Sequence, residues 1–170
     1  MRFPLSLEHM KIRDELAGDE GAIRNVVSEA FGRIQEAGLV DALRQNGDLF
    51  ISLVAEIDGR IEGHVALSRL KSPPRSLALA PVSVASAAQR RGIGSALVRA
   101  SIELARQRDS EFIFVLGDAA YYSRFGFSAD TAKLFRCQYV GPHFMALRLS
   151  DGTATAAAPA VYADTFADLA

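Results

Sequence analysis

The sequence has one cysteine, no tryptophan and almost equal numbers of acidic and basic residues. A single cysteine, Cys137, excludes an internal disulfide framework and a cysteine-rich metal site. We therefore expect no bound metal and a buried, structural thiol at Cys137. The 19 Lys and Arg against 20 Asp and Glu give a formal net charge of −1. A surface that binds nucleic acid is usually basic, so we expect no nucleic-acid partner.

Long hydrophobic runs are also missing. No window approaches the roughly 18 consecutive apolar residues of a membrane-spanning helix. The first residues, Met1 to Glu8, lack the apolar run of a signal peptide. We therefore expect a cytoplasmic protein without a membrane partner.

The chain does have enough apolar residues for one sizeable core. Of its 170 residues, 49% are hydrophobic, which fits a single domain over residues 1–170. The domain core is predicted over about 5–150, and residues 151–170 form a C-terminal extension. This extension is rich in alanine and threonine, but Val161, Tyr162 and Phe166 indicate that part of it packs.

Hydrophobic periodicity predicts an alternation of helices and strands. Helices are predicted after the N-cap Asp19, over 34–44, over 93–104 and over 119–124. Strands are predicted over 5–12, 49–57, 61–70, 77–84, 112–116, 134–140 and 144–149. Asp58-Gly59 predicts a hairpin turn, and Gly141-Pro142 is expected to join the last two strands as a second hairpin. The helix between strands 77–84 and 112–116 predicts that these two strands are parallel.

Together these elements predict an α/β fold of α+β character. We expect a mixed central sheet of six to seven strands, antiparallel at first and parallel in the middle. About four helices should flank the sheet on both faces.

The most informative stretch is Gln89-Arg90-Arg91-Gly92-Ile93-Gly94-Ser95, which links a strand to a helix. The first N–H groups of a helix lack partners and carry its positive dipole end, so this junction suits an anion. The third glycine of a dinucleotide fingerprint is missing, and so is the Lys-Ser/Thr ending of a P-loop. The pattern indicates phosphate or pyrophosphate binding, with close helix–strand packing as the alternative.

Three motifs in this order resemble the GNAT superfamily of acyl-CoA-dependent N-acetyltransferases. They are Leu79-Ala80-Pro81-Val82-Ser83-Val84, the glycine junction, and Tyr121-Tyr122-Ser123-Arg124-Phe125-Gly126-Phe127. The segment Gly117 to Tyr122 is most similar to the YhbS-like branch. The resemblance covers about residues 5–150 and implies the acyl-CoA N-acyltransferase fold with acetyl-CoA as cosubstrate.

The resemblance also implies residue roles. Gln89, Arg90, Arg91, Gly92, Ile93, Gly94 and Ser95 would hold the CoA pyrophosphate. Val82, Ser83 and Val84 would offer backbone groups to the pantetheine arm, as an added strand does. Tyr122, four residues before Gly126, matches the tyrosine that protonates the departing CoA thiolate. The alternative for Tyr122 is ordinary packing, with Tyr121 as the second candidate, and Asp118 is expected to cap the short helix.

The implied reaction is direct attack of a primary amine on the acetyl thioester. Two alternatives remain: a non-catalytic acyl-CoA-binding sensor or regulatory module, and a small nucleotide-binding protein. No motif selects a general base among Glu29, Glu56, Glu62 and His64.

The sequence does not identify the acceptor amine. Acids at Asp14, Glu15, Glu29, Glu36 and Asp41 would attract a cationic amine or simply form a solvated face. A late strand or the apolar tail can pair between subunits, so a homodimer is compatible with the sequence.

Overall fold

The computed structural model describes residues 7–151 and 158–169. Its strands are β1 (Met10–Asp14), β2 (Leu49–Ile57), β3 (Arg60–Arg69), β4 (Ser76–Val84), β5 (Phe112–Leu116) and β6 (Phe144–Arg148). Its α-helices are α1 (Glu20–Phe31), α2 (Gln35–Gln45), α3 (Ile93–Gln107), α4 (Ala119–Tyr122) and α5 (Ala129–Ala132). Short 3₁₀ turns are η1 (Leu7–His9), η2 (Ser86–Ala88), η3 (Ser123–Phe125) and η4 (Asp164–Leu169).

The described strands form one sheet in the order β1-β2-β3-β4-β5-β6. Every neighbouring pair is antiparallel except β4 and β5, which are parallel. This confirms the predicted mixed sheet and its parallel middle. The Asp58-Gly59 hairpin is also confirmed, because both residues have positive φ, at 50° and 76°, as a type I′ turn requires.

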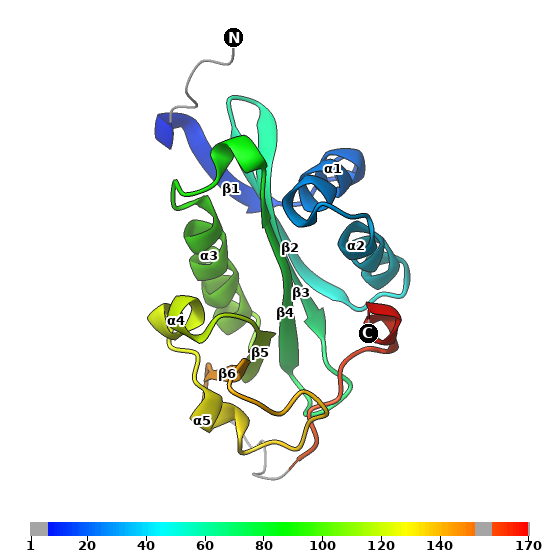
Figure 1. Cartoon of the computed structure of the whole chain (residues 1–170), viewed down its shortest axis with the longest axis vertical. Helices are drawn as coiled ribbons and strands as arrows, with labels where there is room; N and C mark the ends of the chain where they lie inside the picture. Colours follow the sequence, from blue (N-terminus) through cyan, green and yellow to red (C-terminus); the bar gives the residue numbers. More distant parts are fainter. Residues whose placement is uncertain (1–6, 152–157, 170) are drawn as a thin grey trace.

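Helices cover both faces of the sheet, with α3 on one face and α1 and α2 on the other (Figure 1). Side chains alternate along each strand, so neighbouring residues enter different cores. Val65 and Leu67 of β3 pack with Leu97 of α3, whereas Ala66 packs with Val27 of α1. The two faces of β3 and β4 therefore present different chemistry.

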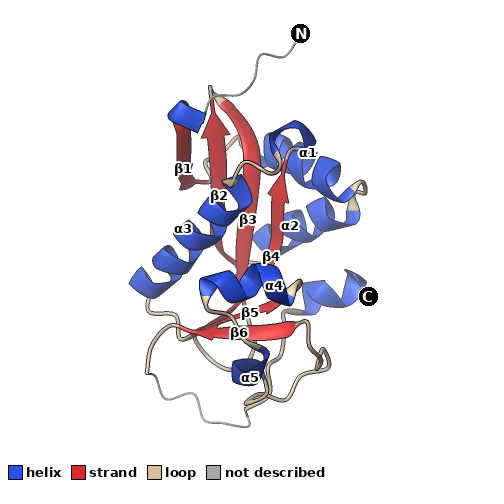
Figure 2. Cartoon of the chain, turned by 60° about the vertical axis from the view of Figure 1, so that its left-hand side comes forward, coloured by secondary structure: helices blue, strands red, loops and turns tan. Residues whose placement is uncertain are grey.

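The sheet opens between β4 and β5. The two strands pair only where Ser76, Leu77 and Ala78 lie beside Phe112, Ile113 and Phe114. Past this point, no further pairing between these strands is found in the described residues. Figure 2 shows β5 and β6 running across the direction of β2, β3 and β4. We call this opening the fork, defined by Leu79–Val84 on one side and by Leu116 and Gly117 on the other.

Two predictions near the C-terminal end of the fold are wrong. The segment 134–140 is not a strand, and β6 pairs with β5 instead of forming a hairpin with this segment. The short helix α5, capped by Ser128, was not predicted.

The side chains of 134–140 do alternate, with Phe135, Cys137 and Tyr139 turned inward. The physical reason is that no strand lies beside this segment: among the described residues its backbone forms only an isolated bridge between Arg136 and Pro159. Phe135 is buried, with its ring centroid 4.9 Å from that of Phe112, while Leu134 and Val140 are 43% and 73% exposed. Cys137 lies in irregular backbone and is only partly buried, so the expected buried position of its thiol is met only in part.

Positions at the chain ends differ in part from expectation. The first strand begins at Met10, later than predicted, and residues 5–6 lie outside the described residues. In the tail, Tyr162 and Phe166 pack against the core as expected, but Val161 is 40% exposed.

Candidate active site

The glycine junction forms a tight loop at the start of α3. Arg90 and Gly92 both have positive φ, at 61° and 81°, and Gly92 is the N-cap of the helix. The N–H of Ala96 donates to the carbonyl of Gly92 over 3.0 Å, which begins the helical hydrogen-bond series. The N–H groups ahead of it, at Ile93, Gly94 and Ser95, therefore have no place in that series. Such a set of convergent N–H groups can bind a phosphate.

The backbone of β4 faces the fork at alternate residues. The N–H of Ala85 donates to the carbonyl of Glu62 in β3 over 2.8 Å, so Ser83 also directs its backbone to β3. The backbone groups of Val82 and Val84 then point the other way, into the fork. The side chain of Gln89 donates to the carbonyl of Val84 over 3.1 Å. The remaining fork-facing groups can pair with an extended ligand.

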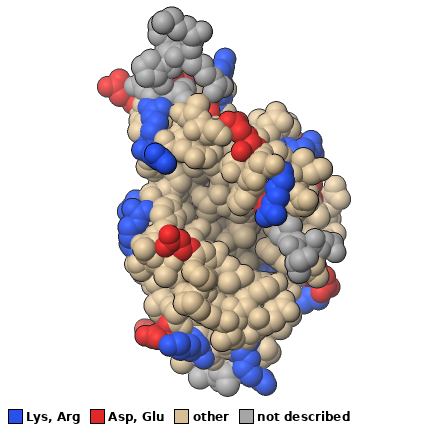
Figure 3. Space-filling view, viewed as in Figure 1, with Lys and Arg blue, Asp and Glu red and all other residues tan. Residues whose placement is uncertain are grey.

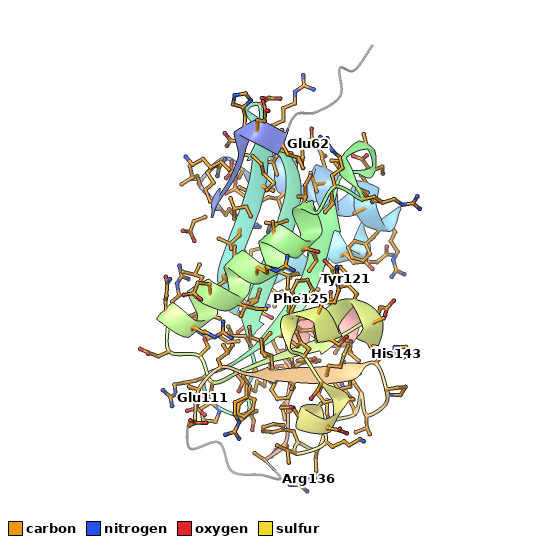
Figure 4. The ribbon with its side chains drawn as sticks, turned by 90° about the vertical axis from the view of Figure 1, so that its left-hand side faces the viewer. Glu62, Glu111, Tyr121, Phe125, Arg136 and His143 are labelled. Atoms are coloured by element: carbon orange, nitrogen blue, oxygen red, sulfur yellow. The ribbon has the colours of Figure 1, made fainter. Side chains whose placement is uncertain are left out.

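The loop, the β4 edge and α4 meet at Gly94. A Cβ at Gly94 would lie 3.4 Å from the Tyr121 hydroxyl oxygen and 3.6 Å from Val84 Cγ2. The Tyr121 hydroxyl is 3.4 Å from Ser95 Oγ, and Arg124 stacks over the Tyr121 ring at 4.6 Å. Figure 4 shows Tyr121 and Phe125 between α3 and the α4 segment. Tyr121 thus lies beside the loop.

Tyr122 is the last residue of α4, and its ring lies beside the end of β5. The carboxylate of Asp118 caps α4 by accepting from the N–H of Ala120 over 2.7 Å, as the sequence predicted. The Tyr122 ring then lies against Gly117, and its ring centroid is 5.8 Å from that of Phe127. Burial raises the pKa of Tyr122 to about 12. Its hydroxyl therefore keeps its proton at neutral pH and is available as a donor.

His64 is the centre of a buried polar chain under α1 and α2. Its Nε2 is 2.8 Å from Ser52 Oγ, which in turn hydrogen-bonds to the Glu15 carboxylate. Arg44 donates to Glu15 over 2.8 Å. Burial, followed by the Arg44 charge, lowers the pKa of His64 to about 3, so the ring is neutral. Its Nδ1 is buried without a hydrogen-bond partner, as is Oγ of the cross-strand neighbour Ser83.

The other base candidates lie elsewhere. Glu29, Glu56 and Glu62 line a cavity of about 420 Å³ between α1 and the β2–β3 hairpin. Glu56 is held by Arg13 at 2.9 Å, and Glu29 accepts from the N–H of Ser86 over 3.0 Å. Figure 4 shows Glu62 at the end of the molecule away from Tyr121. The structure does not bring these carboxylates to Tyr122.

Arginines neutralise most of the acids that were considered for attracting a cationic amine. Each of the following has an arginine within 4 Å: Asp14, Glu15, Glu36 and Asp41. These pairs leave little unbalanced negative charge for a cationic ligand.

A cavity of about 270 Å³ opens on the face of the fork opposite Tyr122. It is lined by Ala78, Leu79, Ala80, Leu116, Tyr139, Tyr162 and Phe166. We call it the fork cavity. Figure 3 shows the molecule hollowed in its middle, with most Lys, Arg, Asp and Glu around the rim. No sequence pattern predicts this site, and its only local signal is the aromatic pair Tyr162 and Phe166 in an alanine-rich tail.

The chain is similar to known proteins over the region that contains these motifs. The family model described as "Acetyltransferase (GNAT) family" matches residues 20–127. The chain belongs to the GNAT family of acetyltransferases. It is 34% identical over 131 residues to the uncharacterized N-acetyltransferase YjhQ of Escherichia coli K12, covering 72% of each chain. It is 32% identical over 148 residues to YhbS of the same strain, covering 84% of this chain and 89% of that one.

Solved GNAT structures match nearly the whole chain. The Escherichia coli YhbS structure in complex with CoA has a TM-score of 0.84 and 28% identity, covering 98% of this chain and 95% of that one. A GNAT acetyltransferase from Brucella melitensis in complex with acetyl-CoA has a TM-score of 0.78 and 33% identity. That match covers 93% of this chain and 98% of the other. The acyl-CoA N-acyltransferase-like fold is thereby confirmed.

No group of three or more His, Cys, Asp and Glu side chains suited to a metal ion is found among the described residues. None of the helices in the described part of this GNAT protein is long and apolar enough to cross a membrane.

Proposed function

We propose that this GNAT protein transfers the acetyl group of acetyl-CoA to a primary amine by direct attack. The observation that carries the proposal is the fork, whose free β4 edge runs between the glycine loop and Tyr122. The relatives crystallised with CoA and acetyl-CoA support the choice of donor.

In this proposal the donor lies along β4. The loop from Gln89 to Ser95 binds the pyrophosphate through the free N–H groups at the start of α3, and Arg90 and Arg91 add positive charge. The pantetheine arm pairs with the fork-facing backbone of Val82 and Val84. Ser83 has a different role from its neighbours, because its backbone pairs with β3 and its side chain points under α1.

The proposed reaction needs no covalent enzyme intermediate. The amine nitrogen forms a bond to the thioester carbon, the C–S bond breaks, and the thiolate takes a proton while the nitrogen loses one. Tyr122 is the proton donor to the thiolate. Its raised pKa makes it a weaker acid than a free phenol, but a buried site also raises the pKa of the thiol formed there. The ordinary pKa of a thiol is ~8.5. In the buried site the thiolate is more basic than this value implies, so it accepts a proton from Tyr122 more readily.

The test is thiol release from acetyl-CoA with a panel of primary amines. We expect turnover, and we expect Tyr122→Phe to lower kcat by about 100-fold, within the range of general acid catalysis. Tyr121→Phe is the matched control, because it removes the neighbouring hydroxyl, and it should retain kcat within about threefold. An unchanged kcat in Tyr122→Phe would reject the general-acid role.

The same assay distinguishes the proposed enzyme from the two alternatives. A sensor or regulatory module predicts that CoA binds in calorimetry while no amine in the panel releases thiol. The nucleotide-binding alternative predicts that ATP or NAD binds and that CoA does not.

A further inference from the structure

We propose that the acceptor is an amine with a small apolar or aromatic body, which fills the fork cavity against a wall formed by the C-terminal tail. This inference rests on the proposed function and names the substrate class of the same site.

The cavity and Tyr122 lie on opposite faces of the same gap. Along β5, Ile113 and Val115 enter the core under α3, whereas Phe112 and Phe114 enter the core under the tail. Continuing this alternation, Leu116 lines the fork cavity and Gly117 faces the Tyr122 ring. A molecule in the cavity therefore reaches the fork from the face opposite the proposed general acid.

The lining is uncharged and largely apolar, with Tyr139 and Tyr162 as its polar members. None of the described residues that line the cavity is Asp, Glu, Lys, Arg or His. Leu116 is 45% exposed, although the other four residues of β5 are buried. An apolar side chain therefore lies exposed at the mouth of the cavity. The cavity volume of about 270 Å³ suits a small group. The described lining has no charged side chain to pair with the ammonium groups of a polyamine or an aminoglycoside, so burying those charges there would be costly.

The aromatic wall is fixed in place. The rings of Tyr139, Tyr162 and Phe166 form a row, with centroids 5.1 Å and 5.2 Å apart. The tail that carries two of them is held by paired backbone bonds, from Val161 N–H to the Ser72 carbonyl over 2.8 Å and from Lys71 N–H to the Val161 carbonyl over 2.7 Å. Tail residues also join the cluster of Leu39 and Leu43 on α2. The wall is thus a packed part of the domain.

An apolar cavity also favours the reactive form of the acceptor. A desolvated ammonium loses its proton more readily, because burial disfavours the charged form. The neutral amine is the species that attacks the thioester. Burial raises the pKa of Tyr162, so this wall residue stays uncharged as well. An apolar amine would therefore arrive at the fork in its nucleophilic state without a carboxylate in the cavity.

The experiment measures kcat/KM of the full chain with 2-phenylethylamine, ethylamine and spermidine. We expect 2-phenylethylamine to be preferred over both by at least about tenfold, the scale of apolar recognition. Phe166→Ala should raise KM for 2-phenylethylamine about tenfold and leave the KM of acetyl-CoA within about threefold. Phe166→Leu should restore part of the loss, and Ala167→Leu, on the exposed side of the same turn, is the control.

Ala80→Leu tests the same cavity without touching the tail. It fills the space from β4, so it should lower kcat/KM for 2-phenylethylamine about tenfold more than it lowers kcat/KM for ethylamine. A preference for spermidine, or equal rates for 2-phenylethylamine in wild type and Ala80→Leu, would overturn the inference.

Failure of the proposed function gives a different result. If no amine releases thiol, saturation-transfer NMR of 2-phenylethylamine with the CoA-bound protein tests the cavity alone. A signal that is lost in Ala80→Leu supports the apolar site, and no signal in the wild type rejects it.

Discussion

The ring of Tyr122 occupies the space that a side chain on Gly117 would need. A Cβ built on Gly117 would lie 2.5 Å from Tyr122 Cε2 and 3.1 Å from Cδ2. The backbone at the end of β5 therefore packs closely against the Tyr122 ring of α4, with no space for another side chain between them. Because the backbone of Gly117 is outside the left-handed region, the missing side chain is explained by this contact alone.

Gly117→Ala should displace the Tyr122 ring and lower kcat. A misplacement of about 1 Å can cost about 100-fold in rate, so we expect a loss of tenfold or more. CoA affinity, measured by calorimetry, should change little because the glycine loop is untouched. Gly38→Ala on α2, where an added Cβ meets nothing within 4 Å, is the control. Wild-type kcat in Gly117→Ala would show that the Tyr122 position does not matter for turnover.

The pH profile of kcat should lack the fall that a free phenol produces near pH 10. Burial raises the pKa of Tyr122 to about 12, so its hydroxyl stays protonated through pH 10.5. Steady-state rates at saturating amine between pH 8 and 10.5 check this. A decline centred near pH 10 that disappears in Tyr122→Phe would contradict the expected shift.

His64 should make the protein less stable in acid. Its pKa falls from 6.5 to about 3 on folding, so below pH 6.5 the unfolded chain binds a proton that the folded protein does not. The stability that the folded protein has over this pH range is complete above pH 6.5 and is lost progressively as the pH falls toward about 3.

Urea unfolding at pH 7, 6, 5 and 4 measures the effect. The difference between wild type and His64→Gln should shrink with each step toward acid. His9→Gln, at an exposed histidine, is the control and should follow the wild type. Parallel stability curves for wild type and His64→Gln would show that His64 titrates normally.

Gly63→Ala should push α3 away from the sheet. A Cβ at this position would lie 2.9 Å from Ile93 Cγ2 and 2.9 Å from Leu97 Cδ1, both of them buried core side chains. We expect a loss of about 1–3 kcal/mol in the free energy of unfolding, typical of overpacking. Gly21→Ala, on the exposed face of α1, should instead raise stability slightly, by about 0.5–1 kcal/mol. Chemical denaturation of both variants gives the comparison, and equal stability of Gly63→Ala and wild type would contradict close packing there.

Local signals predicted much of this fold. The positive φ at Asp58 and Gly59 follows from two residues, and the loop at Gly92 follows from its place between a strand and a helix. The cap at Asp118 is equally local. Each of these depends on neighbours within a few positions, which is what a sequence pattern can show.

The parts that could not be predicted depend on distant contacts. Segment 134–140 has the composition and the alternating burial of a strand, but its expected partner, β6, pairs with β5 instead. The chain from Glu15 through Ser52 to His64 joins residues up to 49 positions apart, so spacing gives no hint of it. The fork cavity is likewise lined by residues of β4, β5 and the tail, which are far apart in the sequence.

The opening between β4 and β5 also has a kinetic consequence. The glycine loop lies at the start of α3, and the fork cavity opens on the opposite face of the sheet. Donor and acceptor would therefore enter by separate routes and be bound at the same time. Such an enzyme forms a ternary complex before any product leaves, so its double-reciprocal plots intersect rather than run parallel.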